Sequence, residues 1–222
     1  MDIESIGNSP IGKIVPISGY DRRFDEEFAH FAFVPSPLPA DFVLSGATYS
    51  VVVDATAAPA RADQAASLLP NPDLLARPAT RREAVSTSAL EGTYAALSDV
   101  FEADFLERGQ MSASVSEVQN YVSAAEHAYG WLAEGRPITL NMIEQLHQVL
   151  IDGTPSDGPE AGHVRTTQVF IGAGRGRVPT ARYVPPPPGD LLRDGLLDWE
   201  QWIRQPSSTP SLIRIAAAHY QF

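Results

Sequence analysis

A stripe of apolar residues with helical spacing is the feature that most constrains the fold of this chain. Between residues 116 and 133, apolar side chains recur every three or four positions, and the pattern ends before Gly135 and Pro137. This spacing places them on one face of an α-helix that must pack against other elements. We expect the helix to be capped by Ser114 or Ser116, and its stripe to belong to a core. The stripe consists of Val118, Tyr121, Val122, Ala125, Tyr129 and Leu132.

Start and stop signals predict further helices, so the fold class is mainly α. Residues 1–59 are rich in proline and are expected to form loops and extended segments, with residues 49–53 either a short strand or a buried helical turn. The other predicted helices are Ala58 to Leu69, one capped by Thr139, one capped by Asp190, and one that starts at Pro210.

The stretch Thr80 to Thr93 contains both the predicted start of another helix and a glutamate on that helix, Glu91. Thr80 and Glu83 have the spacing of a capping box, which predicts a helix from about Arg81. Thr87 and Glu91 lie four residues apart on one face of this helix, which we expect to run towards Leu106 with a break near Gly92. Gly92 would allow another backbone to approach closely. We therefore expect a carboxylate at a crowded position, although a single glutamate on a helix usually lies on a solvated face.

The segment Thr87-Ser88-Ala89-Leu90-Glu91-Gly92 resembles the inhibitory motif of the Fic family, Ser/Thr-x-x-x-Glu-Gly/Asn. The resemblance extends over roughly Phe33 to Phe222. It is carried by Leu69 to Leu75, Arg82 to Ala84, Glu117 to Tyr121, Leu146 to Leu150, Gly162 to Arg165, Gln168 to Gly172 and Tyr183 to Pro187. It implies part of a Fic-type helical core, an N-terminal helical domain and one β-hairpin flap. Residues 1–110 would form the N-terminal domain, with the inhibitory helix at about 81–92, and residues 111–222 the start of the core, with the flap at about 164–184.

The same resemblance implies an activity, because Fic proteins are mostly adenylyltransferases that move AMP from ATP onto a hydroxyl of a target protein. Their catalytic loop, His-Pro-Phe-x-Asp/Glu-Gly-Asn-Gly/Lys-Arg, supplies the general base and holds Mg²⁺ and the phosphates. His219-Tyr220-Gln221-Phe222 resembles the helix before this loop, but the loop motif does not occur in the 222 residues. We therefore name no catalytic residue and no metal ligand, expect His219 to pack or face solvent, and expect this chain alone to be inactive. ATP and Mg²⁺ are expected for a full-length family member.

The resemblance also assigns roles to Glu91 and Thr87. In the family, the glutamate pairs with the last arginine of the catalytic loop and prevents it from holding the ATP γ-phosphate, and Thr87 would hold the helix in place. Here Glu91 would be exposed or would meet another cation, such as an arginine of the flap. The alternative function is a non-catalytic binding or antitoxin-like protein that uses the flap, or lends Glu91 in trans to another Fic protein.

Between the helices, a β-prone run, a glycine-rich turn and four prolines predict a hairpin with a mobile tip. By resemblance it is the flap, onto which a target protein docks by strand addition. Arg175 and Arg177 are candidate phosphate contacts. A phosphate-binding loop, an RNA-binding patch and an ordinary surface hairpin are the other interpretations of this segment. The predicted docking residues are Gln168, Val169, Phe170, Ile171 and Gly172.

The amino-acid composition excludes some classes of binding partner. The net charge of −11 repels nucleic acid and anionic lipid, so neither is expected as a partner, and the sequence has no cysteine. The first residues lack the pattern of a secretory leader, which favours a cytoplasmic protein. The resemblance leaves the oligomeric state open between a monomer and a homodimer, since Fic proteins frequently form dimers. Glu144 and His147 have the i, i+3 spacing of some metal sites but no second copy, so we expect His147 to lie in or near the core.

Overall fold

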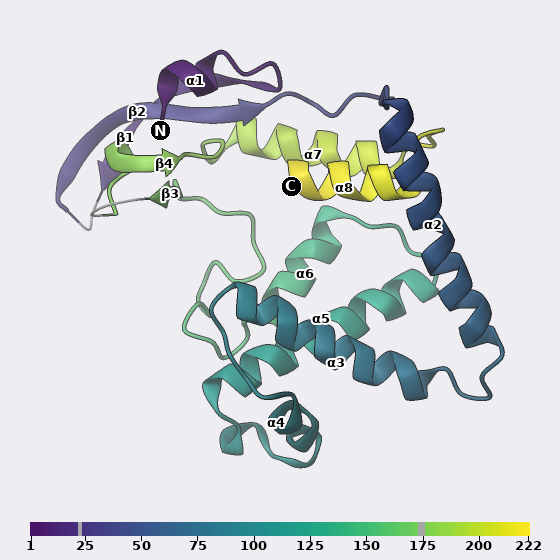
Figure 1. Cartoon of the computed structure of the whole chain (residues 1–222). Coiled ribbons are helices and arrows are strands. Elements are labelled where there is room, and N and C mark those ends of the chain that lie inside the picture. Colours follow the sequence, from purple (N-terminus) through teal and green to yellow (C-terminus); the bar gives the residue numbers. More distant parts are fainter. Residues whose placement is uncertain (22–23, 173–175) are drawn as a thin grey trace. The chain divides into compact units, whose positions relative to one another are not determined.

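The computed structural model describes residues 1–21, 24–172 and 176–222 (Figure 1). The described chain is mainly helical, with two small antiparallel sheets of two strands each. It divides into two compact units, Leu44–Val164 and the pair of segments Met1–Val43 and Arg165–Phe222. The mainly α fold with a hairpin flap is therefore confirmed. The boundary at 110 and 111 stays a prediction, and it does not coincide with the division between these units.

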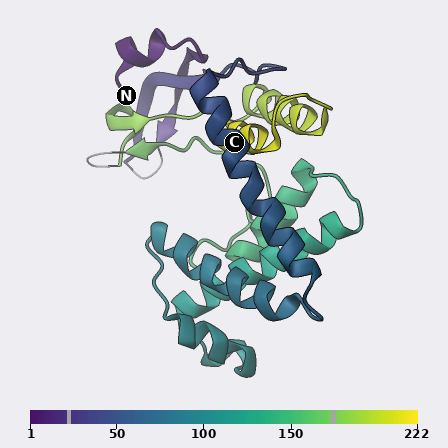
Figure 2. The ribbon, with the colours of Figure 1, turned by 45° about the vertical axis from the view of Figure 1, so that its right-hand side comes forward.

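The unit Leu44–Val164 consists of helices and loops without a strand, and we call it the helical unit. Its core is formed by Ala84, Val100, Val118 and Val122, which come from three different helices. In Figures 1 and 2, α3 runs alongside α5. The elements are α2 (Gly46–Ser67), α3 (Asp73–Leu90), α4 (Leu97–Glu102), two short 3₁₀ turns (Ala103–Phe105 and Arg108–Gln110), α5 (Ala113–Ala133) and α6 (Leu140–Ile151).

Helix α5 carries the predicted stripe but begins earlier than expected. Its cap is Ser112, whose hydroxyl accepts the Val115 N–H, and neither Ser114 nor Ser116 has this role. Val118 and Val122 are buried as predicted, whereas Tyr129 and Leu132 are exposed, and Trp131 is the buried residue of the last turn of α5. The predicted cap of α6 is confirmed, because Thr139 accepts the Met142 N–H at 3.1 Å.

Helix α3 begins eight residues before the predicted start, so the capping box at Thr80 is wrong. The Thr80 hydroxyl instead donates to the Ala76 carbonyl at 3.1 Å inside the helix. The start lies at Asp73, where the N–H bonds to the Asn71 side chain at 3.1 Å. A threonine in a helix interior can satisfy its hydroxyl on the preceding turn, which makes the sequence pattern ambiguous.

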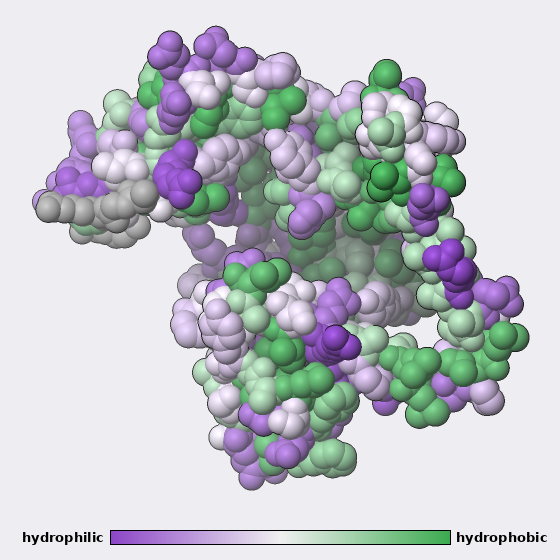
Figure 3. All heavy atoms as spheres, in the orientation of Figure 1, coloured by the Kyte–Doolittle hydropathy of each residue, from purple (hydrophilic) through white to green (hydrophobic). Residues whose placement is uncertain are grey.

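Helix α2 includes the ambiguous residues 49–53, which are helical, and only Val52 of α2 is buried. The connection from α2 to α3 exposes apolar side chains, visible as green spheres at the lower right of Figure 3. These side chains are Leu68, Leu69, Leu74 and Leu75.

The second unit joins the two ends of the sequence, and we call it the flap unit. Strands β1 and β2 pair antiparallel from Gly12↔Pro35 to Asp21↔Glu26, and β3 pairs with β4 in the flap. Its elements are α1 (Ile3–Gly7), β1 (Gly12–Asp21), β2 (Glu26–Pro35), β3 (Ile171–Gly172), a 3₁₀ turn (Val178–Thr180), β4 (Ala181–Tyr183), α7 (Asp190–Arg204) and α8 (Ser211–Gln221).

The β1–β2 hairpin refines the prediction of loops and extended segments at the start of the chain, because two of these segments pair as strands. Its core partners lie far away in the sequence: Ala32 packs with Val178, Ala181 and Val184 of the flap. The periodic signal is weak because the neighbouring Ala32 and Phe33, which point to opposite faces of β2, are both buried, and because Pro16 interrupts β1. Two predicted caps are also shifted by one residue: Gly189 precedes α7, and Pro210 is the cap of α8.

Candidate functional site

The C-terminus of α3 is built by backbone hydrogen bonds. The Thr93 N–H donates to the Ser88 carbonyl at 2.9 Å, and the Gly92 N–H donates to the Ala89 carbonyl at 3.2 Å. This pair of bonds is a Schellman motif, in which Glu91 is the cap and Gly92 adopts a positive φ of 91°. The helix therefore stops at a defined residue and places Glu91 at its end.

Gly92 is explained by its backbone conformation and not by crowding. A Cβ added there would meet no atom within 4 Å, which contradicts the expected close approach of another backbone. The positive φ is what favours glycine, because L-residues with a side chain rarely adopt it.

Glu91 is exposed, so the expectation of a crowded carboxylate is wrong. Within residues 1–21, 24–172 and 176–222 its carboxylate makes no ion pair or side-chain hydrogen bond. The side chain is therefore accessible to a cation in solution or on another molecule.

Thr87 lies one turn before Glu91, beside the phenol of Tyr121 on α5. The Tyr121 hydroxyl donates to Glu83 Oε1 of α3 at 3.5 Å. Burial raises the pKa of Tyr121, the Thr87 hydroxyl opposes this rise, and the Glu83 carboxylate adds to it. The phenol thus stays neutral and links the two helices.

Two further contacts hold α3 against its neighbours, one just after its last residue and one near its middle. After α3, the Thr93 hydroxyl donates to Glu117 Oε2 of α5 at 2.6 Å. Near its middle, the buried Arg81 pairs with Asp104, with Nη2 at 2.6 Å from Oδ2. The end of α3 that carries Glu91 is therefore held by side chains from α5.

The flap is a short hairpin with one exposed face. Ile171 pairs with Tyr183 and Gly172 pairs with Ala181, with an irregularity in the register between them. Ile171 is 64% exposed and Val169 is 43% exposed, whereas Phe170 packs on the core of the flap unit. Among the described residues no strand covers the other edge of β3.

The base of the flap is held by donors that meet a run of prolines. Arg165 donates to the Pro186 carbonyl and, at 3.0 Å, to the Thr167 carbonyl. Gln168 Nε2 donates to the Pro185 carbonyl at 3.2 Å. Prolines have no N–H, so their carbonyls need side-chain donors from outside the run. Gln168 therefore has a structural contact besides its predicted role in docking.

The two predicted phosphate contacts differ in their outcome. Arg175 lies outside the described residues. Arg177 is described, and its Nη1 lies 3.0 Å from Glu26 Oε2 while its guanidinium lies 4.6 Å from the centre of the Phe24 ring. Arg177 is thus engaged by the N-terminal hairpin.

Glu144 and His147 hold the loop after α6. The Gly162 N–H donates to His147 Nδ1 at 3.1 Å, and the Val164 N–H donates to Glu144 Oε1 at 3.1 Å. His147 is exposed, which contradicts its expected place in or near the core. Over the part of the chain that the structure describes, no three His, Asp or Glu side chains gather as a metal site would require.

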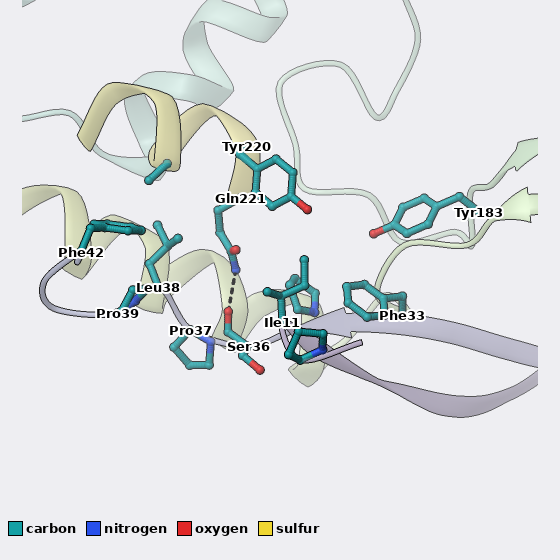
Figure 4. A pocket seen from close by; sticks show the side chains of 13 residues that line it. Ile11, Phe33, Ser36, Pro37, Leu38, Pro39, Phe42, Tyr183, Tyr220 and Gln221 are labelled. Atoms are coloured by element: carbon teal, nitrogen blue, oxygen red, sulfur yellow. Dashed lines mark hydrogen bonds between the residues drawn. The ribbon is translucent and has the colours of Figure 1, made fainter. Parts of the chain in front are cut away.

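The flap unit also contains an apolar cavity of about 720 Å³ (Figure 4). Phe33, Phe42 and a proline-rich segment line one side, and Tyr220 and Gln221 of α8 line the other. Burial raises the pKa of Tyr183 at its edge, and the nearby Tyr220 adds to this rise. The lining contains no carboxylate or histidine, so these residues do not form an acid–base site.

The comparison with known families matches the helical unit. Residues 49–130 match the family described as Fic/DOC family N-terminal. This segment is similar to the N-terminal region of Fic/DOC proteins and covers less than half of the chain. It runs from the first turns of α2 through most of α5, so it includes Thr87, Glu91 and Gly92 together with Tyr121 and Glu117.

The flap lies outside the matched segment, in the other compact unit. Thr87, Glu91 and Gly92 therefore form one local site, and residues 168–172 form another. In the described residues, no helix combines the length and apolar character that crossing a bilayer requires.

Several residues of these sites were not predicted from the sequence. Tyr121 was assigned to the core stripe, and its hydroxyl gave no signal of a partner on α3. Arg165 could have been found, because a run of four prolines leaves carbonyls that need donors. Glu26 and Phe24 had no local signal, since their partner Arg177 is 151 residues from Glu26.

Proposed function

We propose that this protein belongs to the Fic machinery that transfers AMP from ATP to a hydroxyl of a target protein, and that Glu91 inhibits the transfer. In this reaction the hydroxyl oxygen attacks the α-phosphate, pyrophosphate leaves, and the hydroxyl proton goes to a base. By resemblance, the base and the phosphate-binding arginine belong to a His-Pro-Phe loop. The 222 residues contain no such motif, so they are not expected to catalyse the transfer alone.

The observation that carries the proposal is the presentation of Glu91 within the family-matched segment. A Schellman motif places its carboxylate at the exposed end of α3, free of an ion pair in the described chain. Such a carboxylate can compete with a phosphate for one guanidinium, and like charges about 4 Å apart near a protein surface repel by roughly 4 kcal/mol.

The flap would dock the target by strand addition through residues 168–172. Support comes from the edge of β3, which no described strand covers, and from the exposure of Ile171 and Val169. ATP would be the nucleotide substrate. The described residues do not gather the carboxylates that Mg²⁺ requires, so no step of the mechanism is assigned to a metal held by them.

An α-labelled ATP transfer assay tests this function. The protein would be expressed with the His-Pro-Phe loop, as the parent, as Glu91→Gly and Glu91→Gln, and as the control Glu126→Gln, which neutralises an exposed acid on α5. We expect both Glu91 variants to transfer label at least about tenfold faster, equivalent to roughly 1.4 kcal/mol. Equal rates for the parent and the Glu91 variants would contradict inhibition by Glu91, and no label from any form would contradict the transferase.

The exposed, unpaired Glu91 also favours a second function, inhibition in trans. In this case the 222-residue chain would slow label transfer by a separate Fic enzyme that lacks its own inhibitory glutamate. The Glu91→Gln chain would not slow the transfer, and Glu126→Gln would act like the parent.

A further inference from the structure

Three side chains join the flap to the turn of the N-terminal hairpin. Arg177 pairs with Glu26 at 3.0 Å and lies over the ring of Phe24 at 4.6 Å. The side chains of Arg177 and Glu26 are only 39% and 33% exposed, so water screens this pair less than a fully exposed one. One guanidinium therefore makes both a charge contact and an aromatic contact.

A shared core lies next to this cluster. Ala32 of β2 is fully buried against Val178, Ala181 and Val184 of the flap. The Phe33 N–H donates to the Val184 carbonyl at 2.8 Å, so a backbone bond also joins the two hairpins. These contacts hold β4, whereas β3 consists of two exposed residues.

We propose that Arg177 and Glu26 are positioning residues that clamp the flap onto the β1–β2 hairpin. The clamp fixes the chain where it returns from the tip of the flap, and so limits the positions that β3 can adopt. Both residues lie outside the family-matched segment 49–130. If the flap docks a target as proposed above, the N-terminal hairpin sets the geometry of the docking edge, and this consequence rests on the proposed function. The clamp itself does not depend on that function.

Amide hydrogen exchange measured by NMR on the full chain tests the clamp. We expect Arg177→Ala to accelerate exchange of the Phe33 amide and of the amides in β4 by roughly three- to thirty-fold, from loss of the ion pair and the aromatic contact. Glu26→Gln, which keeps the shape of the side chain, should give a smaller acceleration. The matched control is Arg182→Ala, because Arg182 is exposed on β4.

A charge exchange separates the clamp from a simple packing role. In the double variant Glu26→Arg with Arg177→Glu, the Phe33 and β4 amides should exchange more slowly than in either single variant. The reason is that the double variant again places one positive and one negative side chain opposite each other. The amides of Val118 and Val122 in the helical unit are the internal reference and should be unchanged.

Three results would overturn the clamp. The first is exchange of the Phe33 and β4 amides in Arg177→Ala that is no faster than in Arg182→Ala. The second is exchange of these amides in the double variant that is as fast as in the single variants. The third is an equal acceleration of the α5 amides. These readouts require no nucleotide or target, so failure of the clamp is distinguishable from failure of AMP transfer.

Discussion

Two tryptophans show how differently the two units are built. Trp131 in the helical unit and Trp202 in the flap unit are 9% and 7% exposed, and each donates its indole N–H to a proline carbonyl at 2.8 Å. An arginine guanidinium lies over each indole ring. Its Cζ is 3.7 Å from the ring centre for Arg136 on Trp131 and 4.5 Å for Arg214 on Trp202. The proline partner of Trp131 is six residues away, but that of Trp202 is 163 residues away. The same interaction is thus local in one unit and joins distant segments in the other.

The largest expected effect comes from removing either indole. Trp202→Ala should destabilise the flap unit by about 3–5 kcal/mol, because a large buried ring and its hydrogen bond are lost. It should release the segment around Pro39 while the amides of α5 keep their protection. Trp131→Ala should cost a similar amount in the helical unit. Urea denaturation with hydrogen exchange in both units measures this difference.

A conservative change provides the control for these tryptophans. Trp202→Phe keeps most of the apolar area and loses the bond to the Pro39 carbonyl, so it should cost less than Trp202→Ala. Loss of protection throughout α5 in Trp202→Ala would contradict the view that the two units are stabilised separately.

Two glycines of the helical unit give a smaller effect of opposite sign. Gly92→Ala should destabilise by about 1 kcal/mol, because the Schellman motif requires its positive φ. Gly130→Ala should stabilise by roughly 0.5–1 kcal/mol, since it lies within α5 and a Cβ there meets no atom within 4 Å. Thermal unfolding of both variants checks the signs, and equal signs would contradict the backbone explanation of Gly92.

The smallest effect is the alkaline pH dependence of Tyr183 and Tyr121, one in each unit. Burial raises the pKa of both phenols above the ordinary value of 10.0. Below pH 10 both are neutral in the folded and unfolded chain, so their contribution to stability is constant. Above pH 10 the unfolded chain loses these protons first, and the free energy of unfolding falls.

Replacing each phenol in turn tests this dependence. Tyr183→Phe and Tyr121→Phe should each make the fall of the free energy of unfolding above pH 10 less steep. Denaturant unfolding at several pH values measures it, and a slope identical to that of the parent would show that the phenol titrates normally.

Sequence-based prediction was more accurate for the helical unit, where contacts are local, than for the flap unit, where distant segments meet. In the helical unit, the apolar stripe of α5, the Thr139 cap of α6 and the break near Gly92 after α3 were predicted because they depend on residues within a few turns. The start of α3 was wrong, since a threonine followed three residues later by glutamate also occurs inside a helix. The β1–β2 hairpin was missed because its apolar face is covered by the flap, more than 140 residues later.

For the candidate sites, sequence alone determined the chemistry of the α3 terminus: a hydroxyl at Thr87, a carboxylate at Glu91 and a glycine that can end the helix. Only the tertiary structure decided that Glu91 is exposed, that Thr87 lies beside Tyr121, and that Arg177 is held by Glu26. The physical reason is that helix caps and periodicity arise from neighbours along the chain. Exposure and ion pairing instead depend on which distant segments the folded core brings together.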